Sequence, residues 1–236
     1  MVTFSALKHN ALLIYQTESR YPVRRIFCIG RNYAAHAAEM GNKVDRDAPF
    51  FFTKSPHHIS ENNTDWPYPP GTSDLHHEVE LVAAVGSELR NIAEADALDG
   101  IWGYAVGLDM TRRDLQARAK EKRHPWDVAK DFEGSAIFGA LRSAKDWGKP
   151  SSQNLSLTVN GTVRQSAPLS DMVWSLPEIV AYLHPNEHLL RPSTRCPARS
   201  STAPATTQPH GVPQASITST DPIDQHSCVL HCSHSG

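Results

Sequence analysis

HHEVELVAAVG, at residues 76–86, is an apolar run with two carboxylates near its start. The composition is typical of a strand that enters a hydrophobic core. Because side chains alternate along a strand, Glu78 and Glu80 share one face, and the apolar residues between and beyond them take the other. A pair of this kind is most often a solvated strand face. Here the charges stand at the mouth of a buried strand and need a partner, which favours a bound cation.

Working outward, further strands are expected where short apolar runs lie between turn residues. These are 24–30, 49–54, 103–110 and the two arms of a hairpin around Asn160-Gly161 within 155–166. Helical segments are expected at 31–41, 94–103, 111–123 and 175–183. The segment 55–74, rich in Pro and Asn, is predicted to be a long loop.

Two of the helix starts carry a capping-box spacing, Thr111 with Asp114 and Ser175 with Glu178. Pro185 is expected to end the last helix. The elements lack the regular βαβ alternation of a nucleotide-binding fold, and no glycine-rich phosphate loop is present. The fold class is therefore β-rich α+β.

The composition of the 236 residues narrows the function classes. A net charge of -2 argues against nucleic-acid binding, and no apolar run approaches the ~20 residues of a membrane helix. The first 20 residues do not make a convincing secretory signal, so we expect a cytoplasmic protein. The expected partner is a small molecule rather than a nucleic acid or a membrane.

Composition also changes along the chain. Residues 186–236 hold none of the chain's Phe, Tyr, Trp or Lys and are rich in Ser, Thr and Pro, so they bury too little apolar surface to offset the entropy of ordering. We therefore expect an N-terminal extension at 1–21, a catalytic domain at 22–184, and a low-complexity, disordered or non-native tail at 185–236.

Asp109 supplies a third carboxylate at the end of an apolar strand. It could equally be a turn or capping residue. Three carboxylates with water in the remaining positions suit a hard ion such as Mg²⁺, or Mn²⁺ in its place. The neighbouring His76 and His77 are possible ligands, although packing and solvent contact are the plainer interpretation.

His36 and Glu39 are three residues apart on a short predicted helix and so share a face. A carboxylate beside an imidazole raises its basicity, as a water-activating general base needs. The alternative is an ordinary surface contact. The polar turn before them, which contains Arg31, favours the functional interpretation.

Four further polar side chains would each, taken alone, be ordinary surface groups. Together they could offset the negative charge that an anionic ligand meets near three carboxylates and a divalent ion. They are Lys54, Arg112, Gln116 and Lys130.

Six strings, in this order, resemble the fumarylacetoacetate hydrolase family over about residues 22–184. They are RIFCIGRNYAAHAAEMG, PFFFTK, SDLHHEVELVAAVG, GYAVGLDMTRRDLQ, PWDVAKDFEGSA and LTVNGTVRQ. The resemblance implies a mixed β-roll and a homodimer.

The resemblance also implies roles for the candidate residues. Glu78, Glu80 and Asp109 would bind Mg²⁺ or Mn²⁺. His36 and Glu39 would form the water-activating dyad, and Lys130 would act near a developing enolate. The implied substrate contacts are Arg31, Lys54, Arg112 and Gln116.

The implied activity is metal-dependent hydrolysis of the C–C bond of an acylpyruvate, with fumarylpyruvate giving fumarate and pyruvate, as in aromatic catabolism. An oxaloacetate decarboxylase or 2-oxo acid tautomerase is the alternative within the family. After the helix at 175–183 the family continues with Thr-Gly-Thr-Pro and Gly-Val-Gly motifs, which are absent here. The roll is thus expected to be incomplete at its C-terminal end, and an impaired remnant is a third possibility.

Overall fold

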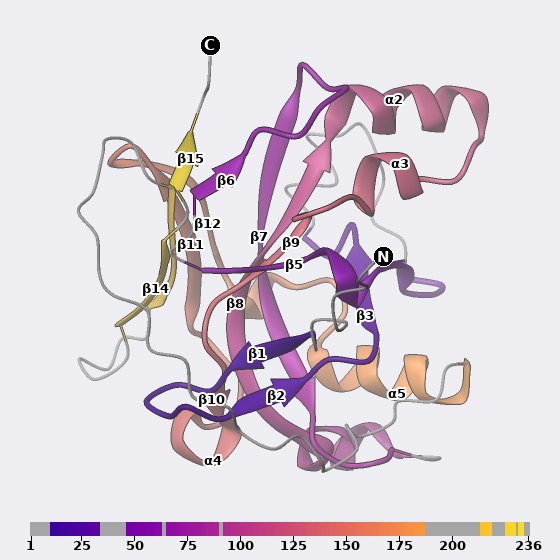
Figure 1. Ribbon diagram of the computed structural model, residues 1–236. Coiled ribbons are helices and arrows are strands. Elements are labelled where there is room, and N and C mark those ends of the chain that lie inside the picture. Colours follow the sequence, from indigo (N-terminus) through magenta and orange to yellow (C-terminus); the bar gives the residue numbers. More distant parts are fainter. Residues whose placement is uncertain are drawn as a thin grey trace, which may run out of the picture.

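The computed structural model is mostly β-structure with a few short helices around it (Figure 1). It describes residues 10–33, 46–62, 65–89, 92–186, 213–218, 225–229 and 231–233. The predicted helix at 31–41 falls largely outside these residues, and so do His36 and Glu39. No helix in the described ranges has the length and apolar character needed to cross a bilayer.

Two long antiparallel strands form the centre of the fold, β7 (Leu75–Val85) and β8 (Ile101–Arg112). They belong to a five-stranded sheet that also contains β5 (Ile59–Glu61), β9 (Ala136–Phe138) and β10 (Arg142–Ser143). β9 and β10 pair with β8, and β5 runs parallel to β9.

A second sheet contains the predicted hairpin. β11 (Asn154–Val159) and β12 (Thr162–Pro168) are antiparallel, and Asn160 and Gly161 between them have φ values of 52° and 76°. Two positive φ values in a two-residue loop are the signature of a type I′ turn, so the hairpin prediction is confirmed. The sheet order is β12-β11-β13-β14.

Three strands come from residues 185–236, where the sequence indicated a tail. They are β13 (Pro213–Thr218), β14 (Gln225–Val229) and β15 (His231–Ser233). β13 pairs with β11, and β15 runs parallel to β6 (Asp65–Pro67). The domain boundaries themselves stay a prediction.

Two hairpins complete the β-structure. One joins β1 (Ala11–Leu13) to β2 (Arg20–Pro22), and the other joins β3 (Ile26–Gly30) to β4 (Phe50–Lys54). The strands predicted at 24–30 and 49–54 are thereby confirmed. The loop predicted at 55–74 was partly wrong, because β5, β6 and the 3₁₀ helix η1 (Pro56–His58) lie within it. The partners of β5 and β6 are distant in sequence, so local patterns do not show them.

The helices are short and lie at the rim of the sheets (Figure 1). They are α2 (Arg113–Lys122), α3 (Asp127–Lys130), α4 (Ala144–Trp147) and α5 (Leu176–Asn186), with the 3₁₀ helices η2 (Glu94–Gly100) and η3 (Leu169–Asp171). α5 continues past Pro185, so the expected stop there was wrong by one residue. The capping box expected at Thr111 was also wrong, since no side chain caps α2.

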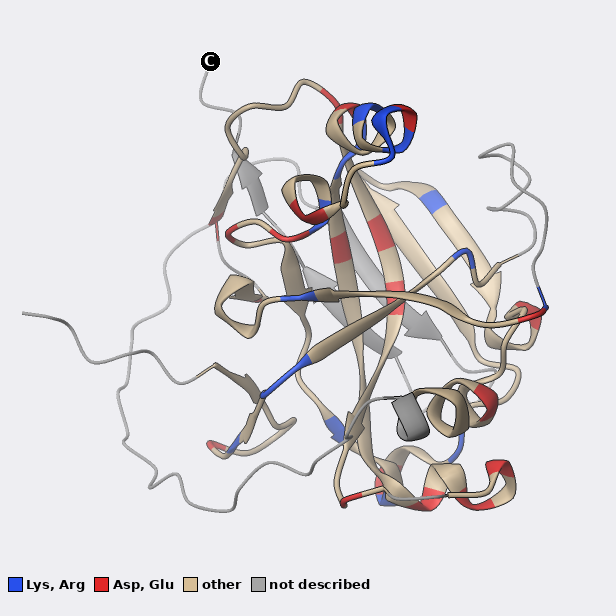
Figure 2. Ribbon diagram, turned by 90° about the vertical axis from the view of Figure 1, so that its right-hand side faces the viewer, with Lys and Arg blue, Asp and Glu red and all other residues tan. Residues whose placement is uncertain are grey.

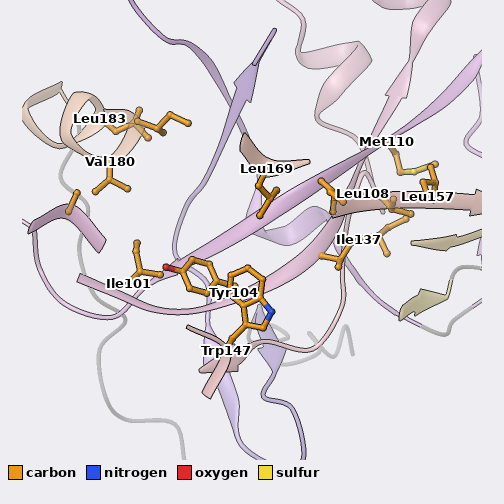
Figure 3. Close-up of a cluster of buried hydrophobic side chains, with 14 of the residues drawn as sticks. Ile101, Tyr104, Leu108, Met110, Ile137, Trp147, Leu157, Leu169, Val180 and Leu183 are labelled. Carbon is orange, nitrogen blue, oxygen red and sulfur yellow. The ribbon is translucent and has the colours of Figure 1, made fainter. Parts of the chain in front are cut away.

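The main core lies against one face of β7 and β8 (Figure 3). Leu108 and Ile137 are fully buried there, together with Leu157 from the second sheet. The opposite face packs a smaller cluster around Leu141. Side chains of each strand alternate between these two faces. On the second face, polar side chains can therefore replace apolar ones at one end of β7 and β8 without disturbing the main core.

The capping box at the start of α5 is confirmed. Ser175 N donates to Glu178 Oε2 at 2.7 Å, and Glu178 N donates to Ser175 Oγ at 3.4 Å. Arg46 adds an ion pair of 2.8 Å to Glu178. The hydrogen bond from Arg46 and that from Ser175 N lower the pKa of Glu178 to about 2.

We therefore predict that Glu178→Ala lowers the free energy of unfolding by about 1 kcal/mol at pH 7, the usual effect of losing a cap. Because folding depresses this pKa, the stabilisation is present above the ordinary value of 4.5 and is lost as the pH falls toward about 2. Urea titrations at pH 7 and pH 2.5 measure it. An equal difference between variant and parent at both pH values would contradict the ion-pair contribution.

Candidate active site

Glu78 and Asp109 face each other across the two central strands. They are direct partners in the β7–β8 register, and Glu80 is opposite Gly107. Opposed residues of an antiparallel pair project to the same face, so the three carboxylates share one side of the sheet. Acidic positions on both long strands are visible near the middle of the molecule in Figure 2.

Lys130 links two of these carboxylates. Its Nζ donates to Glu78 Oε2 at 2.6 Å, to Asp109 Oδ2 at 2.7 Å and to Thr111 Oγ1 at 2.7 Å. The residue is 3% exposed and is the last of the short helix α3. Thr111 thus holds the lysine instead of capping α2, which explains the failed capping prediction.

Lys54 approaches the same cluster from the end of β4. Its Nζ lies 2.9 Å from Asp109 Oδ1 and donates to Met110 O at 3.2 Å and to the carbonyl of Lys130. The contact with Asp109 is an ion pair without hydrogen-bond geometry, because Oδ1 is a buried oxygen with no hydrogen-bond partner. Lys54 is therefore a structural cation that ties β4 to α3 as well as a neighbour of the carboxylates.

The electrostatics of the cluster follow from its burial. Burial, together with the charges of Asp109 and Glu78, raises the pKa of Glu80 well above its usual value. Burial opposes the charge of Lys130, but the carboxylates of Asp109 and Glu78 outweigh it and raise its pKa. Lys54, Lys130 and Arg113 pair with Asp109 and Glu78. Burial disfavours the ionised form of Glu80, so a further cation beside Glu80 would stabilise its charge.

The donor set fits a hard divalent cation. Carboxylate oxygens are the ligands that Mg²⁺ and Mn²⁺ prefer, and Asp109 Oδ1 has an unused acceptor position. In the described residues no three such side chains converge closely enough to form a closed metal cage, because Lys130 lies between Glu78 and Asp109. Binding a metal would require the lysine to exchange part of its contacts.

Arg113 and Gln116 lie beside Glu78 on α2. Arg113 Nη2 pairs with Glu78 Oε1, and Arg113 Nη1 donates to Gln116 Oε1 at 2.7 Å. Gln116 is buried, with 3% of its surface exposed. The predicted Gln116 therefore joins the cluster, and it does so through a residue that the sequence prediction did not include.

Arg112, predicted as a substrate contact, points elsewhere. Its guanidinium lies 4.1 Å from the centre of the Phe132 ring, and Nη1 donates to Val128 O at 3.3 Å. Within the described part of the chain it makes no ion pair with the three carboxylates. Its Nε is buried without a hydrogen-bond partner.

The polar turn after β3 is anchored to the segment before α5. Asn32 Nδ2 donates to Trp174 O at 3.0 Å, and Asn32 Oδ1 accepts from Trp174 N at 2.8 Å. Arg31 is exposed, has a φ of 60°, and its guanidinium lies 5.5 Å from the centre of the Phe50 ring. The predicted dyad of His36 and Glu39 follows the turn but lies outside the described residues.

A cavity of about 420 Å³ opens beside the cluster. Lys54, Glu80 and Asp109 are among its polar lining residues, and apolar residues of β3, β7 and α5 also line it. The carboxylates are thus reachable from a concave space, as a binding site requires.

A family model described as the fumarylacetoacetate hydrolase C-terminal domain matches residues 25–192. The chain belongs to this family. The match covers both central strands, α3 with Lys130, and the hairpin.

Relatives in the family carry two kinds of name. Fumarylpyruvate hydrolase of Ralstonia sp is 40% identical over 153 residues, covering 64% of this chain and 79% of the relative. An oxaloacetate tautomerase of Arabidopsis thaliana is 40% identical over 159 residues, covering 67% of this chain and 71% of the relative. The oxaloacetate tautomerase YcgM of Escherichia coli is 37% identical, covering 69% and 74%.

A crystal structure in the family shows a divalent metal. Fumarylpyruvate hydrolase from Pseudomonas aeruginosa, in complex with Mn²⁺ and pyruvate, superposes with a TM-score of 0.82 at 33% identity, covering 98% of this chain and 99% of its own. The expected fold class, a mixed α+β fold of this family, is therefore confirmed. A divalent metal in a family member agrees with the chemistry of the carboxylate cluster.

Proposed function

We propose that this chain is a metal-dependent hydrolase that cleaves the C–C bond of an acylpyruvate, with fumarylpyruvate as substrate and fumarate and pyruvate as products. The observation that carries the proposal is the buried cluster in which Lys130 bridges Glu78 and Asp109 at the end of a cavity. The relationship to a fumarylpyruvate hydrolase at 40% identity supports the choice of substrate.

Glu78, Glu80 and Asp109 are the residues that would hold Mg²⁺ or Mn²⁺. When bound, the ion supplies Lewis-acid polarisation of the 2-oxo and carboxylate oxygens of the substrate. Burial, followed by the charges of Asp109 and Glu78, raises the pKa of Glu80, and a divalent cation held there would stabilise the ionised carboxylate.

Lys130 lies where a cation could stabilise negative charge that develops on the substrate. Its ammonium is buried and stays protonated, since its pKa is raised. With Glu78 and Asp109 serving as metal ligands, Lys130 would be able to turn a donor toward the negative charge that develops on the pyruvate fragment. Arg113 and Gln116 next to Glu78 offer further donors for the substrate carboxylate.

The remaining step is water activation, which we assign to His36 oriented by Glu39 on the family resemblance. His36 takes a proton from water, and the water oxygen bonds to the distal carbonyl carbon. The bond between that carbon and the pyruvate methylene then breaks, and its electron pair goes to the pyruvate fragment. That fragment takes up a proton, so water, fumarylpyruvate, fumarate and pyruvate balance.

Oxaloacetate tautomerisation is a second candidate, favoured by relatives of that name at 40% and 37% identity. It moves one proton between carbon and oxygen of the substrate and consumes no water. The same carboxylates and Lys130 would serve it, so the polar cluster does not separate the two reactions.

A substrate comparison tests the proposal. The purified chain, with Mn²⁺ and separately with Mg²⁺, is given fumarylpyruvate, acetylpyruvate and the enol form of oxaloacetate, and pyruvate release and enol absorbance are followed. We expect metal-dependent pyruvate release from fumarylpyruvate. Rapid loss of the oxaloacetate enol with no cleavage of either acylpyruvate would replace the hydrolase by the tautomerase.

A further inference from the structure

Lys130 belongs to a helix that is too short to be stable by itself. α3 is a single turn, closed by a hydrogen bond of 2.7 Å from Asp131 N to Asp127 O. An isolated turn of helix does not persist unless the rest of the protein fixes it. The proposed metal adds a further demand, because Lys130 Nζ would then exchange part of its contacts with the carboxylates. Lys130 therefore needs an anchor that does not involve those carboxylates.

The side chain of Asp131 makes such an anchor. Its Oδ1 accepts a hydrogen bond from Ser55 N at 2.7 Å and lies 2.6 Å from His58 Nδ1. Because an ionised carboxylate only accepts hydrogen bonds, Nδ1 of His58 is the donor in this contact. The side chains of His58 and Asp131 are 30% and 24% exposed, so the pair is partly shielded from water. Neither contact uses a carboxylate of the proposed metal site.

The segment opposite Asp131 is shaped to bring both donors to one point. Ser55 is the N-cap of the 3₁₀ helix η1, its Oγ accepts from His57 N at 3.2 Å, and Pro56 begins the helix. His58 N donates to Ser55 O at 3.0 Å, which closes the turn. Residues three apart lie above one another in a 3₁₀ turn, so His58 comes beside Ser55. The sequence Ser-Pro-His-His thus presents two donors to one acceptor.

The two segments also contact each other on either side of Asp131. Lys54 Nζ donates to the carbonyl of Lys130, and further along β5 runs parallel to β9 (Figure 1). Lys54 is paired with Asp109 Oδ1 at 2.9 Å as well, so a metal held by Asp109 would compete for the same oxygen. The contacts of Asp131 with Ser55 and His58 do not share this dependence on the metal site.

We propose that Asp131 is a positioning residue for Lys130. With its Oδ1 held by Ser55 N and His58 Nδ1, Asp131 fixes the backbone from which the ammonium of Lys130 reaches the carboxylates and turns toward the substrate. The requirement is a hydrogen-bond acceptor at Oδ1. The kinetic consequences rest on the proposed hydrolase function, whereas the placement of Lys130 does not.

Turnover of fumarylpyruvate with saturating Mn²⁺ gives the first test. Asp131→Ala should lower kcat by about 10- to 100-fold, as a misplacement of about 1 Å does. KM should stay within about threefold of the parent value, because an interaction used only in the transition state changes kcat alone. Asp131→Asn should recover most of kcat, since its Oδ1 still accepts from both donors. A parental kcat in Asp131→Ala, or a kcat in Asp131→Asn as low as in Asp131→Ala, would overturn the proposal.

Two further variants separate positioning from a general loss of stability. His58→Ala removes one of the two donors and should lower kcat by less than Asp131→Ala does. Asp146→Ala is the matched control, because Asp146 lies in another one-turn helix, α4, and its Oδ2 accepts from Ser143 Oγ at 2.6 Å. α4 follows β10, which pairs near the start of β8, whereas Asp109 lies near its end. Asp146→Ala should lower the melting temperature and keep the parental kcat.

A double-mutant cycle tests the placement of Lys130 without any substrate. Lys130→Met and Asp131→Ala are made singly and together, and the free energy of unfolding of the metal-free chains is measured by urea titration. If Asp131 positions the ammonium, the loss caused by Lys130→Met should be at least about halved when residue 131 is already alanine. Strictly additive losses would contradict the proposal. If Asp131→Ala does not fold, His58→Ala takes its place in the cycle.

The two measurements also distinguish this proposal from the proposed function. A parent chain that does not turn over fumarylpyruvate would refute the hydrolase, and the stability cycle would then decide the role of Asp131 by itself. A parent that turns over the substrate, combined with additive losses in the cycle, would keep the hydrolase and remove Asp131 as its positioning residue.

Discussion

Lys130→Met should slow fumarylpyruvate hydrolysis by about 100- to 1,000-fold, the usual effect of removing a group that stabilises developing charge. Methionine keeps the length of the side chain and removes the ammonium that contacts Glu78 and Asp109. Steady-state kinetics with saturating Mn²⁺ measure kcat, in which we expect most of the loss.

The same substitution should lower the melting temperature of the metal-free chain. Without the ammonium, Glu78 loses one cation, and among the described residues Asp109 keeps Lys54 as its one cationic partner. Added Mn²⁺ should restore much of the difference. Lys149→Met is the matched control. Lys149 is 72% exposed, and its ion pair with Asp99 is long, with Nζ 3.8 Å from Oδ1, so its loss should have little effect. A Lys130→Met enzyme with the parent kcat would remove the lysine from the mechanism.

Glu80→Gln should abolish the rise in melting temperature that Mn²⁺ causes, with affinity at least about a hundredfold weaker. Glutamine preserves size and removes the charge. His36→Ala is the comparison variant, since it should keep the Mn²⁺-linked rise and lose turnover by about 100- to 10,000-fold. Titration of each variant with Mn²⁺ in thermal melts, followed by turnover assays, separates the two roles.

The metal-free form of Glu80→Gln should be more stable than the parent at alkaline pH. Folding raises the pKa of Glu80 above its ordinary 4.5, so ionisation of the parent costs stability progressively as the pH rises above that value. The gap between variant and parent should thus widen from pH 5 to pH 8 in chelator-treated samples. If Glu80→Gln binds Mn²⁺ as the parent does, Glu80 is not a ligand.

Local patterns were enough to predict part of the geometry of the carboxylate cluster. Alternation along residues 76–86 places Glu78 and Glu80 on one face, and the register of β7 with β8 brings Asp109 opposite Glu78. The hairpin at Asn160-Gly161 was predictable too, because the residues that determine its turn lie within a few positions of one another.

The cations of the site were harder to predict. Arg112 and Arg113 are adjacent at the junction of β8 and α2, and the residue at which the helix begins decides which of them faces Glu78. Sequence patterns locate such boundaries only within a few residues. Lys130 reaches the carboxylates through tertiary packing of α3, so its contacts with Glu78 and Asp109 follow from no local spacing.

The most direct test of the proposed chemistry is the fate of the water oxygen. The purified chain with Mn²⁺ is incubated with fumarylpyruvate in H₂¹⁸O, and the products are analysed by mass spectrometry at early times. Attack of water on the distal carbonyl predicts one ¹⁸O in the newly formed carboxylate of fumarate, in an amount equal to the pyruvate released. Unlabelled fumarate, or consumption of substrate without fumarate and pyruvate, would contradict hydrolysis at this site.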